Sequence, residues 1–185
     1  ATYTGMRREE ICRLRSCDIH EVEGVLCFDI LIHRDADGKE IWDPKSEAGE
    51  RLILVHSYLQ NSTGLIERAK NCEKSKRDRI FFDLPYAAST NKYGAAFSQR
   101  FSKFKKDAGL PRETTFHSFR HLFRTMLGHR SDGLNYPVEW IDQILGHETA
   151  GMGRHYNAGT TPSNLMKVVR TVKFESWDPM EIKNR

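Results

Sequence analysis

The sequence RHYNAG places a tyrosine, Tyr156, nine residues after His147. Its phenol is a candidate nucleophile, but an unperturbed tyrosine titrates at about pH 10 and attacks poorly at neutral pH. Unless a base and positive charge lie beside it, a half-buried packing aromatic is the simpler interpretation. The candidate chemistry therefore depends on the basic side chains that the rest of the chain brings to Tyr156.

The segment TFHSFRHLFRTML contains the first such group. His117 and Arg120 are three residues apart and share one face of the predicted helix, so both can point at one spot. For this pair alone, a packed imidazole and a solvated guanidinium would be the simpler interpretation. His117 and His121 also have the spacing of a two-histidine metal face, but no HExxH glutamate or third ligand accompanies them, which disfavours a metal site.

Three shorter motifs carry further candidates. In LGH, Gly146 allows the chain to turn at the end of a predicted helix, so that His147 projects. In TGMRREE, Arg7 precedes Glu10 by three residues, a spacing at which the carboxylate can brace the helix. Lys45 lies in a predicted turn that could reach into a groove; by itself it is a solvated turn lysine, and Lys39 is the alternative if the turn differs.

The 185-residue chain has the size of one domain and a net charge of +4. Lysine and arginine gather in the stretches 67–79 and 98–109, whereas the acidic residues are spread evenly. Basic stretches are usually solvated faces, but two of them beside a candidate site are compatible with a surface that tracks nucleic-acid phosphates. In the second stretch the candidates for such phosphate contacts are Arg100, Lys103, Lys105 and Lys106.

The cysteines and the hydropathy pattern narrow the class of protein. The four cysteines form no C-x-x-C pair, which indicates reduced thiols in a cytosolic protein. A zinc site on Cys12, Cys17 and Cys27 is disfavoured because no second spaced pair completes it. No apolar run approaches the roughly 18 residues of a membrane helix, and the first residues lack a signal-peptide pattern. We therefore expect a cytoplasmic protein without metal, cofactor or membrane contact.

The apolar pattern predicts a mainly helical α+β domain with a small three-stranded antiparallel sheet. The first strand is expected at 24–33, the second directly after the turn at Asp37-Gly38, and the third at 50–56. Lys45 then lies at the mouth of the turn between the second and third strands. A first helix is expected behind an N-cap at Thr4. Later helices are predicted at 93–109, 115–130 and 137–147, with a short helix or strand at 163–174 and an ambiguous segment at 57–70.

Two sets of apolar residues receive specific predictions. Phe97, Phe101 and Phe104 recur at helical spacing and are expected to be core residues rather than base-stacking aromatics. The apolar residues of 163–174 are expected to pack against their own protomer or against a neighbouring one.

The order Gly-x-Arg-x-x-Glu, a lysine on a β-turn, His-x-x-Arg-His, Leu-Gly-His and then tyrosine resembles the catalytic domain of the tyrosine recombinases, the phage integrase family. The match runs from about residue 2 to residue 160. Each motif alone is weak, but together and in order they are specific. The family's helices upstream of the first arginine and its DNA-clamping domain have no counterpart here. We therefore expect residues 1–185 to be a catalytic domain truncated on its N-terminal side, with 163–185 as C-terminal segment and tail.

The resemblance implies a role for each candidate. Tyr156 would attack a DNA phosphodiester and form a 3′-phosphotyrosyl link, while Lys45 would protonate the leaving 5′-hydroxyl. Paired guanidinium donors suit the negative charge that develops on the phosphoryl oxygens. The clamp would consist of Arg7 and Arg120 with His147 as a third donor, His117 would accept the phenol's proton or orient the phosphate, and His121 would support the site.

The implied function is site-specific DNA recombination or integration for a phage or other mobile element, without metal or ATP. The alternatives are DNA relaxation of the type IB topoisomerase kind and a non-catalytic DNA-binding remnant. The implied partner is double-stranded DNA, with a homotetramer on DNA and a monomer without it. A bacterial or phage-encoded protein at the nucleoid is expected.

Overall fold

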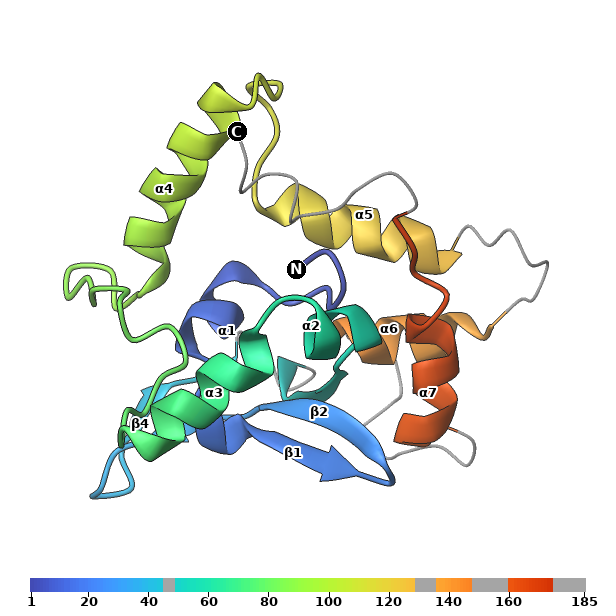
Figure 1. Ribbon diagram of the computed structural model, residues 1–185, viewed down its shortest axis with the longest axis horizontal. Helices are drawn as coiled ribbons and strands as arrows, with labels where there is room; N and C mark the ends of the chain where they lie inside the picture. The colour runs from blue at the N-terminus through green and yellow to red at the C-terminus, as the bar shows by residue number, and fades with distance from the viewer. Residues whose placement is uncertain (45–48, 129–135, 148–159, 175–185) are drawn as a thin grey trace.

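The computed structural model describes residues 1–44, 49–128, 136–147 and 160–174. A short helix and a 3-10 helix come first, the short strands follow, and the other helices come after them (Figure 1). No helix among these residues is long and apolar enough to cross a membrane. The elements are α1 Arg8–Arg13, η1 Ser16–Asp18, β1 Ile19–Val22, β2 Val25–Ile30, β3 His33–Arg34, β4 Glu40–Trp42, β5 Arg51–Leu54, α2 Ser57–Asn61, α3 Leu65–Lys74, α4 Gly94–Asp107, α5 His117–Gly128, α6 Val138–Leu145 and α7 Pro162–Val169.

The predicted three-stranded antiparallel sheet is present, but its strands differ from the prediction. Its order is β1-β2-β5, with Phe28 of β2 opposite Ile19 on one side and Ile53 on the other. β1 was not expected; Glu23 and Gly24 both have positive φ, which suits a two-residue hairpin turn from β1 into β2. The strand after Asp37-Gly38 instead pairs with β3 in a separate two-stranded hairpin.

Helix boundaries also differ from the prediction at two places. Thr4 does not cap α1: its hydroxyl accepts the Met6 N–H in the preceding turn, and the helix begins at Arg8 with Arg7 as N-cap. The ambiguous segment forms two helices, α2 and α3, separated by Gly64 at φ 67°. The remaining helices lie where they were predicted, and the segment after residue 161 is helical.

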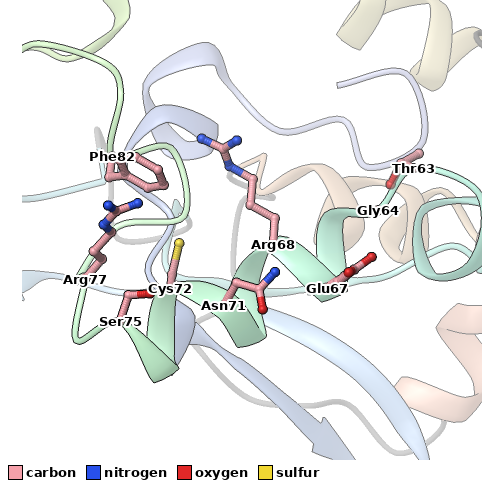
Figure 2. A pocket seen from close by; sticks show the side chains of 9 residues that line it. All are labelled: Thr63, Gly64, Glu67, Arg68, Asn71, Cys72, Ser75, Arg77 and Phe82. Carbon is pink, nitrogen blue, oxygen red and sulfur yellow. The ribbon is translucent and has the colours of Figure 1, made fainter.

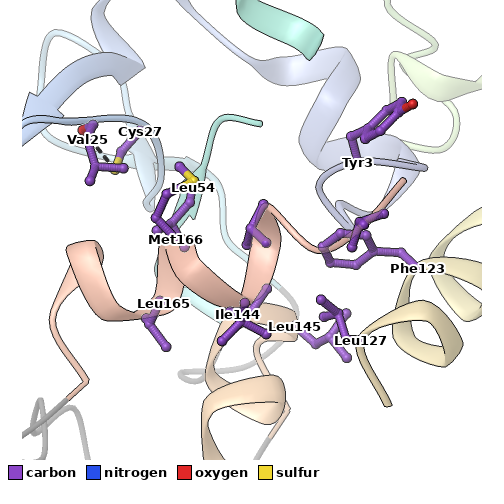
Figure 3. Close-up of a cluster of buried hydrophobic side chains, with 13 residues drawn as sticks. Tyr3, Val25, Cys27, Leu54, Phe123, Leu127, Ile144, Leu145, Leu165 and Met166 are labelled. Carbon is purple, nitrogen blue, oxygen red and sulfur yellow. Dashed lines mark hydrogen bonds between the residues drawn. The ribbon is translucent and has the colours of Figure 1, made fainter. Parts of the chain in front are cut away.

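Two apolar clusters form the core. One joins the sheet to α5, α6 and α7 and includes Phe123, Leu145 and Val168 (Figure 3). The other lies around Phe28, between α1, the sheet and α3. The apolar residues of the C-terminal segment are buried in the first cluster of their own chain, which answers where they dock: Leu165, Met166, Val168, Val169 and Val172.

Helix α4 stands away from both clusters (Figure 1). The expectation that its phenylalanines are core residues is wrong in part. Phe97 and Phe101 are half-buried against Phe116, at 4.8 and 5.6 Å between ring centroids, and Phe104 is 40% exposed. The reason is the way α4 is attached: the Glu9 carboxylate accepts the N–H groups of residues 93 and 94, so polar contacts at its first turn hold it to α1.

Candidate active site

Helix α5 positions Arg120 toward the interior. Arg120, Phe123 and Leu127 recur at helical spacing and are all buried, so the arginine belongs to the apolar stripe of the helix. Its guanidinium donates to the Gly5 carbonyl at 2.5 Å and to the Leu145 carbonyl. A buried charge needs such partners, because an unsatisfied one is costly.

The two carbonyls that Arg120 contacts belong to distant motifs. Gly5 precedes Arg7 by two residues, and Leu145 precedes His147 by two. Both segments turn at a glycine in the left-handed region, Gly5 at φ 62° and Gly146 at φ 65°. One side chain therefore joins three of the motifs that carry the resemblance.

Arg7 is held by the buried carboxylate of Glu10, which also caps the first turn of α1 and so braces the helix, as expected. Glu10 is 3% exposed and accepts the Arg7 N–H at 2.7 Å and the Arg7 Nη1 at 2.9 Å. Its other partner, Arg51, was not singled out from the sequence; the two form a buried ion pair at 3.0 Å. The Arg51 guanidinium is the strongest cause that holds the pKa of Glu10 below its ordinary value, although burial opposes it.

His147 follows the C-cap of α6. Its backbone N–H donates to the Asp142 carbonyl at 3.0 Å, and its ring Nδ1 lies 3.3 Å from the Asp142 carboxylate. Burial and the neighbouring Arg120 lower the pKa of His147, while the Asp142 hydrogen bond raises it; the net shift is downward. Asp142 was also not singled out from the sequence, although a carboxylate that orients a histidine is a common arrangement.

His117 is exposed at the start of α5 and completes the group. Its pKa is lowered, first by desolvation and then by the positive charges of His121, Arg120, Arg7 and His147. The His121 ring contacts it edge-on at 4.6 Å between centroids. The charges of Arg7, Arg120 and His147 thus act on His117, and these four residues are called the arginine-histidine group below.

This group carries more positive than negative charge. The Glu10 carboxylate bonds both Arg7 and Arg51, and its charge also acts on Arg120. Burial, Arg51 and Arg7 lower the pKa of Arg120 to about 10, which still leaves it charged at neutral pH. Such a surplus, in a partly desolvated place, favours an anion with several oxygen acceptors.

Two predicted catalytic residues, Lys45 and Tyr156, lie outside the described residues, so their roles stay predictions. The alternative lysine, Lys39, lies in the turn between β3 and β4, where its carbonyl accepts the Asp35 N–H.

The basic residues of α4 differ in what they contact. Arg100 pairs with Asp83 at 3.3 Å, and the Lys105 ammonium donates to the carbonyls of Arg112 and Thr114, so it fixes the connection to α5. The predicted DNA contacts at Lys103 and Lys106 lie on exposed side chains.

The described part of the chain holds no cluster of three histidine, cysteine or acidic side chains that could bind a metal ion. Burial raises the pKa of Cys12 to about 12 and that of Cys27 to about 11, so both thiols stay protonated. A depression of about 450 Å³ lies along α3, where Arg77 stacks 3.8 Å from the Phe82 ring centroid (Figure 2). It shares no residue with the arginine-histidine group.

Comparison with known proteins identifies the family and the fold of the chain. A sequence model described as the phage integrase family matches residues 1–161. Two solved structures are similar, both of the Tn1549 transposon integrase with DNA. An Arg-to-Lys variant with a circular intermediate DNA is 20% identical, with a TM-score of 0.53 over 99% of this chain and 55% of the other. A Tyr-to-Phe variant with transposon right end DNA is 21% identical, with a TM-score of 0.46 over 98% and 55%.

The chain thus spans about half the length of these integrase chains, and the first of them shares its fold. No curated protein matches the sequence. The family match covers most of the chain and confirms both the resemblance seen in the motifs and the predicted fold class. The chain belongs to the phage integrase family.

Proposed function

We propose that this chain is the catalytic domain of a site-specific DNA recombinase that cuts and rejoins strands through Tyr156. The observation that carries the proposal is the bonding of Arg120, whose buried guanidinium ties the Arg7 segment to the His147 segment within a group of surplus positive charge. Family membership and the structural similarity to an integrase that was solved with DNA support the same substrate class.

In the proposed reaction the Tyr156 oxygen attacks the phosphorus of a phosphodiester. A bond forms from that oxygen to phosphorus, and the bond from phosphorus to the 5′ oxygen breaks. His117 takes the phenol's proton, and Lys45 gives a proton to the leaving 5′ oxygen. Because the phosphotyrosyl link replaces one phosphoester by another, a 5′-hydroxyl can reverse the step without ATP or a metal ion.

Arg7, Arg120 and His147 stabilise the charge that develops on the non-bridging oxygens. Donors fixed before the reaction act without reorganisation, and each typically contributes a few kcal/mol to the barrier, on the order of 3. Glu10 and Asp142 hold two of these donors in place through the bonds described above. The basic residues of α4 add a sequence-independent attraction to the DNA backbone.

Further parts of the proposal concern assembly. The chain acts on double-stranded DNA as a homotetramer and is a monomer without it. Residues 1–185 form the catalytic part of a longer, phage- or bacterium-encoded protein that works at the nucleoid.

A nicked suicide substrate tests the function. The full-length protein is expected to form a covalent protein–DNA adduct that resists detergent, and Tyr156→Phe is expected to form none, because it lacks only the nucleophilic oxygen. Gel mobility of labelled DNA gives the readout, and Tyr136→Phe, a tyrosine outside the motifs, is the matched control. DNA binding without an adduct would support a remnant, and relaxation of any supercoiled plasmid without site preference would support a topoisomerase.

The pH dependence of cleavage follows from the two histidines. The pKa values of His117 and His147 are both shifted downward from 6.5, so both imidazoles are neutral at pH 7. Only the neutral form of His117 can accept a proton, so the cleavage rate is expected to be level above pH 7 and to fall on acidification, with a midpoint below 6.5. Single-turnover rates across pH 5 to 8, in about unit steps, measure this. A rate that increases toward low pH would contradict the assignment.

A further inference from the structure

The guanidinium of Arg51, at the start of β5, donates hydrogen bonds to three other residues. Its Nη1 and Nη2 donate to the two oxygens of Glu10 at 3.2 and 3.0 Å. Its Nη1 also donates to the Gly49 carbonyl at 2.8 Å, and its Nε to the Ile144 carbonyl at 3.4 Å. The side chain is 5% exposed, and each of its three nitrogens donates to a group of the protein, so its guanidinium is engaged within the fold.

The first of these partners, Glu10, leads to Arg7 of the proposed phosphate clamp. Glu10 lies between two guanidiniums and accepts from both Arg7 and Arg51, so the position of Arg51 determines where the carboxylate holds Arg7. Arg7, the second guanidinium that Glu10 accepts from, has 27% of its side chain exposed. A chain of contacts therefore runs from the buried Arg51 through Glu10 to the accessible guanidinium of Arg7.

The third partner leads to His147. The consecutive carbonyls of Ile144 and Leu145, at the C-terminal end of α6, accept from Arg51 and Arg120 respectively. Both cations lie where the partial negative charge of the helix end favours them. The chain then turns at Gly146 and reaches His147. The two buried guanidiniums therefore fix the position of the last residues of α6, from which the turn to His147 begins.

Stability alone does not require an arginine at this place. β5 and α6 also meet through apolar residues, Leu54, Ile144 and Leu145, which belong to one cluster. Apolar residues often replace buried ion pairs without loss of stability. What an apolar residue cannot do is contact a carboxylate and two carbonyls in fixed directions, which is the property of a planar guanidinium.

We infer that Arg51 is a positioning residue for DNA cleavage, which aligns Arg7 through Glu10 and His147 through the end of α6. This inference rests on the proposed function. Arg51 acts through other residues and does not itself contact the phosphate.

The test compares Arg51→Met with Arg13→Met in the full-length protein. Arg13 is an equally buried arginine, 5% exposed, that pairs with Glu9 and bonds a backbone carbonyl, but its contacts lead to α4 and not to the clamp. Arg51→Met is expected to lower the single-turnover cleavage rate at saturating DNA by about 100-fold while the Kd for DNA stays within about threefold. Arg13→Met is expected to change the melting temperature but not the rate.

The conservative variant Arg51→Lys keeps the positive charge but loses the planar guanidinium that donates in several fixed directions. Its cleavage rate is therefore expected to lie between the rates of the wild type and of Arg51→Met. Equal rates for Arg51→Met and Arg13→Met, at temperatures where both are folded, would reduce Arg51 to a structural role and overturn the inference.

A second readout does not need cleavage. Inorganic phosphate is expected to shift the ring NMR signals of His147 in the wild type and in Arg13→Met, but much less in Arg51→Met. If the wild type forms no adduct on the suicide substrate, the proposed function fails, and this experiment still decides the role of Arg51. Equal shifts in all three proteins would overturn it.

Discussion

Replacing Arg120 with lysine is expected to lower the rate of covalent adduct formation by about 1000-fold, since one fixed charge donor is lost from the developing phosphorane. The substitution keeps a positive charge but removes the planar fork. A single ammonium cannot contact the Gly5 and Leu145 carbonyls and also donate paired hydrogen bonds to phosphate. The variant therefore loses both a clamp donor and the tie between two motifs.

Single-turnover cleavage and thermal melting of Arg120→Lys should both change. Loss of a hydrogen bond from a charged donor costs about 2 kcal/mol, so the melting temperature is expected to fall as well. The control is Arg124→Lys, one turn further along the same helix and exposed, for which a rate within about threefold of the wild type is expected. A cleavage rate for Arg120→Lys close to that of the control would contradict the clamp.

Local patterns explain why much of the site was predictable. His117 and Arg120 lie within one turn of an amphipathic helix, and Glu10 braces Arg7 at a spacing of three, so sequence distance alone brings these pairs together. Gly146 ends α6 in the left-handed region, as expected of a glycine at a helix C-cap.

The missed features depend on contacts between distant residues. Arg51 is a lone charge at the start of an apolar strand, and its partners Glu10 and Ile144 are 41 and 93 residues away, so no local period could reveal its burial. Likewise β1 is a strand of four residues, two of them polar, whose pairing with β2 depends on the turn at Glu23-Gly24. The burial of the α4 phenylalanines depends on how that helix docks, which its own amphipathic pattern does not encode.

The positive surplus of the site has a consequence for folding. Besides burial, the charges of Arg51 and Arg7 lower the pKa of Arg120, so each of the two repels Arg120 in the folded chain without DNA. A bound phosphate would offset this repulsion, so ligand binding and stability are linked. The positive charges of the site therefore lower the free energy of unfolding of the chain without DNA, as is common at catalytic sites.

Gly5→Ala is expected to lower the free energy of unfolding by about 3 kcal/mol, from backbone strain of about 1 and overpacking of about 2. The residue has φ 62°, and an added Cβ would lie 2.7 Å from Phe123 Cδ1 and 2.8 Å from Leu145 Cδ2. Both neighbours belong to the main apolar cluster and have little room to move. Urea unfolding followed by circular dichroism measures the change.

Gly24→Ala separates the two causes. Gly24 has a similar φ of 75°, but nothing lies within 4 Å of an added Cβ, so only the backbone strain of about 1 kcal/mol is expected. Because the Gly5 carbonyl is also a partner of Arg120, Gly5→Ala should slow cleavage even well below its melting temperature, whereas Gly24→Ala should not. Equal losses of stability in the two variants would show that the close approach of Gly5 to Phe123 and Leu145 does not constrain the Arg7 segment.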